Sequence, residues 1–104
     1  MMLYDKITGI YKIEYAFDGN SAVLRCSFDV KQNNTSTNVT GHFFNVTNIE
    51  ISSMGSYIPI SGFDIIDHKQ DGWMPENRFQ VYDYEDDSIS FYCESFYFEK
   101  ETEG

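Results

Sequence analysis

The sequence predicts an all-β fold, a single-domain antiparallel β-sandwich or small barrel of about eight short strands. Hydrophobic residues recur with a period of two along most of the chain, whereas the helical period is almost absent. Aromatic residues, which favour strands, are abundant, with nine Phe, eight Tyr and one Trp among 104 residues. Turn-forming clusters of Gly, Asn, Asp and Ser separate the alternating segments. A chain of this length fits one domain, to which we assign residues 1–104.

The first two predicted strands form a hairpin. Apolar side chains alternate with polar ones over residues 10–17 and again over residues 22–30. The sequence Asp-Gly-Asn-Ser lies between them at positions 18–21. Gly and Asn tolerate the positive φ of a tight turn, so we expect these strands to pair antiparallel.

In the middle of the chain the sequence pattern predicts shorter strands. The polar segment 31–38 has no apolar anchor, and we expect it to form a mobile loop. A strand is expected over residues 39–47, followed after a bulge by another that contains Ile49 and Ile51. Residues 57–60 and 63–66 follow as strands, and Pro59 and Gly62 favour an edge or a kink there.

In the last third of the chain the sequence pattern predicts a long loop and a second hairpin. The loop covers residues 67–77 and contains Trp73. Residues 79–84 and 88–93 alternate on either side of three consecutive acids at 85–87, which indicates two paired strands. Phe96 and Phe98 extend or follow the last strand, and residues 99–104 are expected to form a frayed acidic tail.

Charge limits the classes of partner. Seventeen acidic and seven basic residues give a formal net charge of -10. This charge opposes nucleic-acid phosphates and anionic lipids, so we expect no nucleic-acid or membrane partner, and a protein with a basic surface instead. The chain has neither a signal-peptide pattern nor an apolar run near the roughly 20 residues of a spanning helix. We therefore expect a cytoplasmic protein.

No residue pattern indicates catalysis, a cofactor or a metal site. His42 and His68 are the two histidines, and three acids, Asp64, Asp67 and Asp71, lie close to His68 in the sequence. Their spacing departs from that of a calcium-binding EF-hand loop, so we interpret them as a solvated acidic loop. We therefore expect no enzyme. The alternative is an enzyme that uses His68 with these acids.

The two cysteines lie in predicted strands and have no metal-site spacing. We interpret Cys26 and Cys93 as small buried hydrophobic residues. The segments around them also resemble the two cysteine strands of an immunoglobulin domain. However, Phe43 and Phe44 occupy the region where such a domain carries its Trp. An immunoglobulin-like interaction domain remains an alternative.

The second hairpin is the strongest candidate for a binding site. Alternation places Tyr82 and Tyr84 on one face of the strand, and Val81 and Asp83 on the other. If the tyrosines are exposed, two rings lie beside acids that bind Lys and Arg, a composition typical of a recognition hot spot. The alternative is that these tyrosines pack in a second sheet. The candidate partner-binding residues are Asp67, Asp71, Trp73, Tyr82, Asp83, Tyr84, Glu85, Asp86 and Asp87.

In size, acidity and the aromatic and acidic stretch over residues 73–85, the chain resembles immunity proteins of bacterial contact-dependent growth inhibition and related polymorphic toxin systems. The resemblance implies a cognate toxin, commonly a basic nuclease, that is blocked by binding over its active site. Such an immunity protein is expected to be a monomer when free. The alternative function is a carbohydrate-binding β-sandwich module that stacks sugars on exposed Trp and Tyr.

Overall fold

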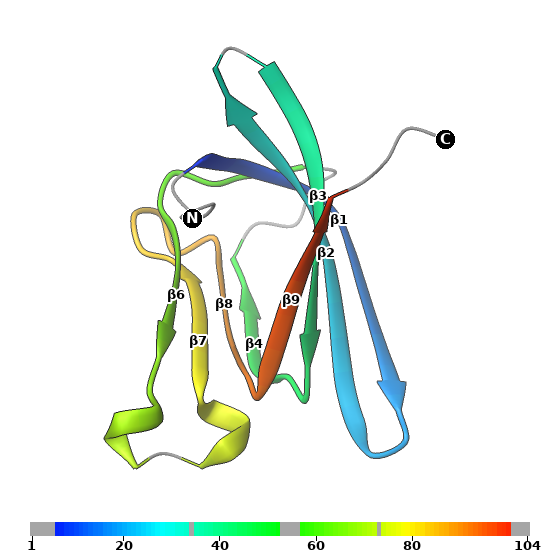
Figure 1. The fold of residues 1–104 in the computed structure, drawn as a ribbon, viewed down its shortest axis with the longest axis vertical. Helices are drawn as coiled ribbons and strands as arrows, with labels where there is room; N and C mark the ends of the chain where they lie inside the picture. The colour runs from blue at the N-terminus through cyan, green and yellow to red at the C-terminus, as the bar shows by residue number, and fades with distance from the viewer. Residues whose placement is uncertain (1–5, 34, 53–56, 73, 101–104) are drawn as a thin grey trace.

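The computed structural model describes residues 6–33, 35–52, 57–72 and 74–100, and these residues form nine strands in two antiparallel sheets (Figure 1). The five-stranded sheet has the order β5-β1-β2-β3-β9. Its strands are β1 (Ile7–Asp18), β2 (Ser21–Gln32), β3 (Thr35–Phe44), β5 (Ile58–Pro59) and β9 (Ser95–Lys100). The described part of the chain contains no helix long and apolar enough to cross a membrane.

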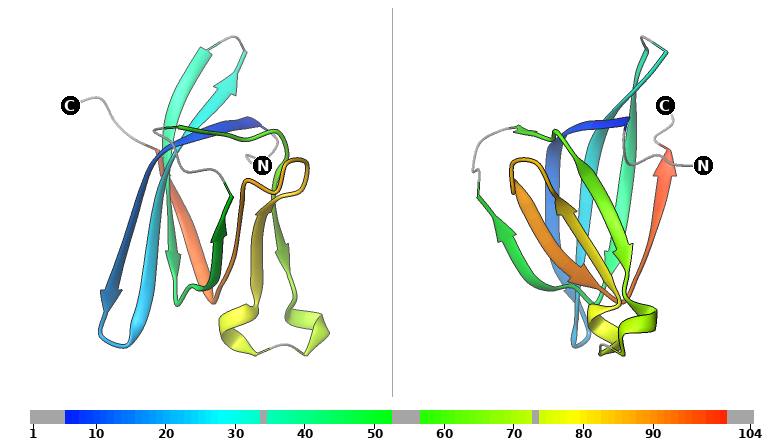
Figure 2. Two further views of the ribbon diagram at one scale, coloured as in Figure 1. Left: turned by 180° about the vertical axis from the view of Figure 1, so that it is seen from behind. Right: turned by 90° about the vertical axis from the view of Figure 1, so that its left-hand side faces the viewer.

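The four-stranded sheet has the order β4-β8-β7-β6 and packs against the first sheet as a sandwich (Figure 2). Its strands are β4 (Thr47–Ile51), β6 (Phe63–Asp67), β7 (Phe79–Asp83) and β8 (Ile89–Cys93). Two short 3-10 turns, η2 (Lys69–Asp71) and η3 (Pro75–Asn77), lie between β6 and β7. The predicted all-β sandwich is confirmed.

Aromatic rings from both sheets form the core. The ring of Phe43 on β3 meets that of Phe91 on β8 edge to face, with 4.9 Å between their centroids. Phe28 on β2 contacts Phe63 on β6 in the same way at 5.2 Å. Such pairs add to the stabilisation that comes from burying their large apolar area. The core therefore joins elements that are distant in the sequence.

Cys26 on β2 and Cys93 on β8 are buried in this core as free thiols. Burial disfavours the thiolate and raises the pKa of each thiol to about 12. Their interpretation as small buried hydrophobic residues is confirmed.

Both predicted hairpins are confirmed. Asp18 pairs with Ser21 to close the β1–β2 hairpin, and Gly19 adopts the positive φ of 67° that the turn requires. β7 pairs with β8 in the same antiparallel manner, with Val81 opposite Phe91. Local turn chemistry is therefore sufficient to identify these two pairings.

The segment expected to be a mobile loop is part of a hairpin. β2 continues to Gln32, β3 begins at Thr35, and Lys31 pairs with Ser36. The prediction was wrong because a strand ladder is held by backbone hydrogen bonds, which do not require apolar side chains. In Figure 1 this end of the hairpin extends beyond the rest of the sandwich at the top of the view.

The strand expected over residues 39–47 is divided between the two sheets. β3 ends at Phe44, Asn45 adopts a positive φ of 55°, and β4 begins in the other sheet at Thr47. The amide of Val46 donates a hydrogen bond to the carbonyl of Ala22 at 3.0 Å, which fixes the crossing. The expected bulge lies further along the chain, within β4, where the register with β8 shifts between Thr47 and Glu50.

The expected acidic tail also begins later than predicted. Glu99 and Lys100 lie in β9, where they pair with Thr40 and Val39 of β3. The remainder of that tail, residues 101–104, lies outside the described residues. Pairing with β3 orders the first two residues because it satisfies their backbone hydrogen-bonding groups.

Candidate functional site

The turn between β7 and β8 is built around the buried carboxylate of Asp83. This side chain is fully buried, and its Oδ1 atom accepts hydrogen bonds from three backbone amides. The donors are Gly62 at 3.1 Å, Glu85 at 3.2 Å and Asp86 at 3.4 Å. One carboxylate therefore holds the turn against the segment that precedes β6.

The electrostatics of Asp83 favour its charged form. Burial acts to raise its pKa, but the nearby Ser88 hydroxyl and the hydrogen bonds from the backbone amides of Glu85, Gly62 and Asp86 act in the opposite direction. The net effect places the pKa of Asp83 below its ordinary value. Asp83 was expected to offer its charge to a partner. That prediction was wrong, because the carboxylate is fully buried: backbone amides hold its Oδ1 atom, and its Oδ2 atom is buried without a hydrogen-bond partner among the described residues.

Further contacts fix the turn from both sides. The hydroxyl of Ser61 donates to the Asp86 carboxylate at 2.7 Å, and that of Ser52 donates to the Asp87 carbonyl at 2.9 Å. The Tyr84 amide donates to the carbonyl of Gly62 at 2.8 Å. A Cβ atom at Gly62 would lie 2.7 Å from the Tyr84 ring, so only glycine admits the ring at this distance. The turn is thus preorganised in one conformation.

This construction exposes three consecutive acids, Glu85, Asp86 and Asp87, beside an aromatic ring. Tyr84 is 56% exposed, and its ring lies 6.2 Å from that of the half-buried Tyr82. The predicted separation of faces is confirmed, because Val81 and Asp83 are buried while Tyr84 points to solvent. We name Tyr84, Glu85, Asp86 and Asp87 the acidic turn.

The outer face of the four-stranded sheet continues this acidic surface. The strand register places Glu50, Ser90, Tyr82 and Asp64 in one row across β4, β8, β7 and β6. An open hollow of about 700 Å³ lies at the β4 end of this row. Glu50 and Asp87 both line it, together with Ser52 and Ser90. Carboxylates therefore border the hollow next to the acidic turn.

The structure separates Asp67 and Asp71 from the acidic turn. Asp67 lies at the other end of β6, where its carboxylate binds Arg78 through two hydrogen bonds of 3.1 Å. The side-chain hydrogen bond from Arg78 is the main reason that the pKa of Asp67 is lowered. Asp71 ends the η2 turn at this same end, while Trp73 lies outside the described residues. Asp67 and Asp71 therefore belong to a different end of the sheet from the acidic turn.

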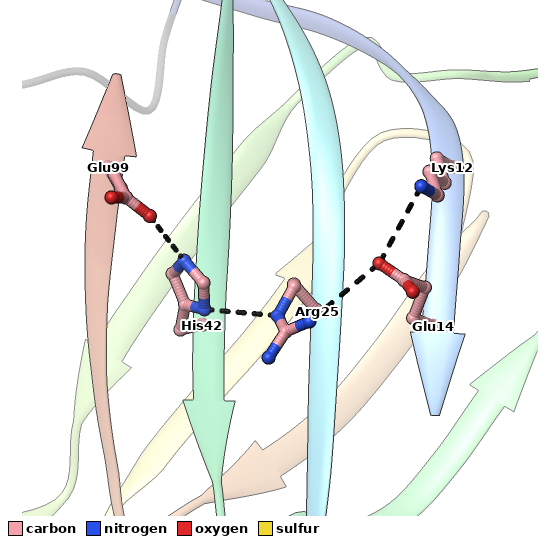
Figure 3. Close-up of polar contacts among 5 residues, drawn as sticks. All are labelled: Lys12, Glu14, Arg25, His42 and Glu99. Carbon is pink, nitrogen blue, oxygen red and sulfur yellow. Dashed lines mark hydrogen bonds and ion pairs between the residues drawn. The ribbon is translucent and has the colours of Figure 1, made fainter. Parts of the chain in front are cut away.

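A polar network that sequence reasoning missed crosses the outer face of the five-stranded sheet (Figure 3). His42 Nδ1 accepts a hydrogen bond from Arg25 Nε at 3.3 Å, and His42 Nε2 lies 3.0 Å from Glu99 Oε1. Arg25 also forms an ion pair of 3.9 Å with Glu14, which Lys12 approaches at 3.8 Å. The His42 ring stacks on Tyr97 at 4.5 Å. In the sequence, the only sign of this network is that polar residues occupy alternate positions of each strand. Which of these residues meet depends on the register between the strands, which the sequence does not give.

Neither histidine lies in a recognisable catalytic arrangement. Both ring nitrogens of His42 are used in the cross-strand network, and His68 Nε2 lies 2.9 Å from the amide oxygen of Gln80. The two residues belong to different sides of the sandwich. Among the residues that the structure describes, no three His, Cys, Asp or Glu side chains are grouped as metal ligands would be.

The sandwich and the acidic turn define a small all-β protein with a preformed anionic surface. A family model described as Immunity protein PIM8 matches residues 18–99. The chain therefore belongs to this family of immunity proteins, which implies a cognate toxin as its partner. No curated protein and no solved structure matches the chain significantly.

Proposed function

We propose that this immunity protein neutralises a nuclease toxin by placing its acidic turn over the basic active site of that toxin. Family membership supports a toxin partner. The observation that carries the more specific proposal is the acidic turn, three exposed carboxylates held in place by the buried Asp83. Residues 79–93, which include the whole β7–β8 hairpin, contain no Lys or Arg that would neutralise them.

The chemistry of the two surfaces is complementary. A nuclease binds phosphates in a cationic cleft, and closely spaced carboxylates present a similar density of negative charge. Opposite fields also accelerate the encounter of the two proteins at low salt. Because the turn is already fixed, little conformational entropy is lost when it binds. Tyr84 adds exposed aromatic area, which is typical of residues that dominate binding energy.

We further infer that the protein acts in the cytoplasm and inhibits its toxin by binding alone. A nuclease toxin acts on nucleic acid in the cytoplasm, so its inhibitor acts there too. Blocking a cleft requires only binding, so His42 and His68 need no catalytic role in it. Their contacts with Glu99 and Gln80 are consistent with structural roles.

The proposal is tested with a variant that neutralises the turn, Glu85→Gln, Asp86→Asn and Asp87→Asn together. The partner in this test is the cognate toxin domain, to be sought in the genes beside that of this chain and assayed for cleavage of RNA and DNA. We expect the association rate constant to fall roughly tenfold at low salt and to become less dependent on salt. Inhibition of cleavage should weaken in parallel. Stopped-flow fluorescence and the cleavage assay measure the two effects.

A matched control separates the local contact from the overall charge. Asp29→Asn, Glu94→Gln and Glu99→Gln together change the net charge by the same amount, away from the acidic turn. We expect this variant to associate nearly as fast as the wild type. Equal slowing by both triple variants would remove the turn from the interface, and a toxin that cleaves neither RNA nor DNA would refute the nuclease assignment.

A further inference from the structure

We propose that the free edge of β1 is a self-association site, at which two copies of the chain join their five-stranded sheets through antiparallel β1 strands. This role is separate from toxin binding and uses different residues. It is the alternative to the expected monomeric state of the free protein, and the experiments below distinguish the two.

The lower half of β1 has one strand neighbour in the described structure. β5 pairs only with Gly9 and Ile10, whereas β2 pairs with β1 as far as the closing pair of Asp18 and Ser21. In Figures 1 and 2 this end of the hairpin extends away from the four-stranded sheet. Among the described residues, none pairs with the other edge of β1 along residues 12–18.

The hairpin register determines which backbone groups face this open edge. Alternate residues of an antiparallel strand direct their N–H and C=O groups to opposite sides. The two-residue turn makes Asp18 and Ser21 a hydrogen-bonded pair, so Glu14 and Ala16 also bond to β2. Ile13, Tyr15 and Phe17 then direct their backbone groups outward, where a further strand would satisfy them.

Two large apolar side chains on the inward face of this edge are exposed. Phe17 is 70% exposed, the highest value among the large hydrophobic residues that the structure describes, and Tyr15 is 51% exposed. Their rings contact each other edge to face at 5.5 Å. Both residues belong to the inward-facing side of the sheet, opposite the buried Leu24 and Ala22. An exposed apolar pair beside an open edge is typical of an interaction site.

The other sheet edges carry features that oppose strand addition. β6 presents Asp64 and Asp67, and β9 ends with Glu99 and Lys100. β4 has only five residues and an irregular register, with a positive φ of 53° at Asn48. Charges, short length and irregular backbone are the usual means by which proteins protect an edge. Residues 12–18 of β1 form a longer and regular segment that carries its charged residues on the outer face, so the inward face with Tyr15 and Phe17 lacks this protection.

The net charge of the β1–β2 hairpin favours a second copy of the chain as the partner at the β1 edge. Residues 11–26 contain two basic and two acidic residues and are therefore neutral, in a chain whose net charge is -10. A basic toxin gains no long-range attraction from this hairpin. Another acidic copy of the chain, in contrast, meets less repulsion here than at a surface that carries the net charge.

A two-fold axis at Tyr15 gives a register with complementary side chains. Residues 12–18 of the two copies then pair completely, and the irregularity between Ile10 and Lys12 marks the end of the paired segment. Lys12 lies opposite Asp18 of the second copy, and Ile13 opposite Phe17. A register centred on Glu14 would place that carboxylate opposite itself, and like charges in direct opposition are unfavourable.

Sedimentation velocity on the full chain, from micromolar to millimolar concentration, tests the proposal. We expect a species of twice the monomer mass that becomes dominant as concentration rises. Phe17→Ser and Tyr15→Ser should each weaken dimerisation at least tenfold. The matched controls are Tyr84→Ser and Tyr97→Ser, because these rings are exposed to a similar degree, at 56% and 51%. Neither control should change the dimer.

Charge reversal tests the register. Lys12→Asp or Asp18→Lys alone places like charges opposite each other and should weaken the dimer roughly tenfold. The double variant restores opposite charges and should restore the dimer. A wild-type chain that stays monomeric throughout, or a double variant that is no better than the single ones, would overturn the proposal.

The outcome is independent of the proposed toxin site. Loss of toxin binding in Phe17→Ser, with a wild-type chain that never dimerises, would assign the edge to the toxin and overturn self-association. Normal toxin binding by Phe17→Ser, together with loss of its dimer, supports the proposal. Variants of the acidic turn that lose toxin binding should dimerise normally.

Discussion

Asp83 shows how a single buried carboxylate can order an exposed surface at the scale of one residue. Its Oδ1 atom accepts hydrogen bonds from Glu85 and Asp86 within the turn and from Gly62, 21 residues earlier in the sequence. Hydrogen bonds to a charged acceptor are stronger than those between neutral groups. The negative charge of Asp83 thus serves the structure, while the charges that follow it face solvent.

Replacing Asp83 with Asn should destabilise the fold and loosen the acidic turn. The substitution keeps the shape of the side chain but removes the charge that strengthens three hydrogen bonds. We expect the free energy of unfolding at neutral pH to fall by about 1–3 kcal/mol. Urea denaturation measures the change. The matched control is Glu85→Gln in the same turn, whose exposed side chain should alter stability by less than about 0.5 kcal/mol.

The loss of unfolding free energy in Asp83→Asn should also depend on pH, and the lowered pKa of Asp83 determines the direction of this dependence. Below the ordinary Asp value of 3.8, the unfolded chain takes up a proton on this residue before the folded chain does. Lowering the pH therefore favours unfolding of the wild type, until the folded-state pKa is passed. The difference in unfolding free energy between wild type and Asp83→Asn should shrink across this window. A difference that stays constant as the pH falls well below 3.8 would contradict the stabilising role of the charged Asp83 carboxylate.

At the scale of elements, Gly62 links the start of β6 to the acidic turn. A methyl group at this position would lie 2.7 Å from the Tyr84 ring and from the Glu85 side chain. We expect Gly62→Ala to lower the free energy of unfolding by about 1–3 kcal/mol, because a close contact must be relieved. It should also weaken toxin binding, since the turn must move. Denaturation and isothermal titration calorimetry measure the two effects.

A second glycine provides the control for this prediction. Gly19 has a positive φ of 67°, and a Cβ atom at this position would have no neighbouring atom within 4 Å, so Gly19→Ala strains only the backbone. It should destabilise the fold by roughly 1 kcal/mol and leave toxin affinity unchanged. Equal losses of affinity in both variants would mean that general stability, rather than the position of the turn, determines binding.

Elements that depend on local chemistry were predictable from the sequence. The two tight hairpins follow from Gly19 and from the alternation on either side of the three acids. The same alternation separates Tyr84 from Val81 and Asp83, but it does not determine which of the two faces is exposed. The change of sheet at Asn45 was not predictable, because a strand pattern does not identify its sheet. The inward role of Asp83 was missed for a similar reason, since one of its donors, Gly62, comes from a distant segment.

At the scale of the whole molecule, negative charge is unevenly distributed. The β7–β8 hairpin carries acids without a single Lys or Arg, whereas residues 11–26 are neutral. The outer face of the four-stranded sheet adds Glu50 and Asp64 in the same row as Tyr82. One side of the sandwich is therefore suited to a basic partner, and the projecting hairpin is suited to a neutral contact.

This distribution predicts that salt will affect folding and binding in opposite directions. The Debye length falls from about 30 Å at 0.01 M salt to about 8 Å at 0.15 M. The molecule measures 40 × 28 × 27 Å, so at the higher concentration its distant acids no longer repel one another strongly. Added sodium chloride should therefore raise the melting temperature of the free protein and slow its association with a basic toxin. Calorimetry and stopped-flow fluorescence measure the two trends.

The variant with a neutralised acidic turn distinguishes the origins of the two trends. Added salt should raise its melting temperature by less than that of the wild type, because fewer charges repel one another. Added salt should also slow its association with the toxin by less. Sodium chloride is preferable to sulfate, which strengthens apolar burial in any protein and would mask the electrostatic effect. A wild-type association rate that is insensitive to salt would show that the toxin meets a surface other than the acidic turn, even if the melting temperature responds as expected.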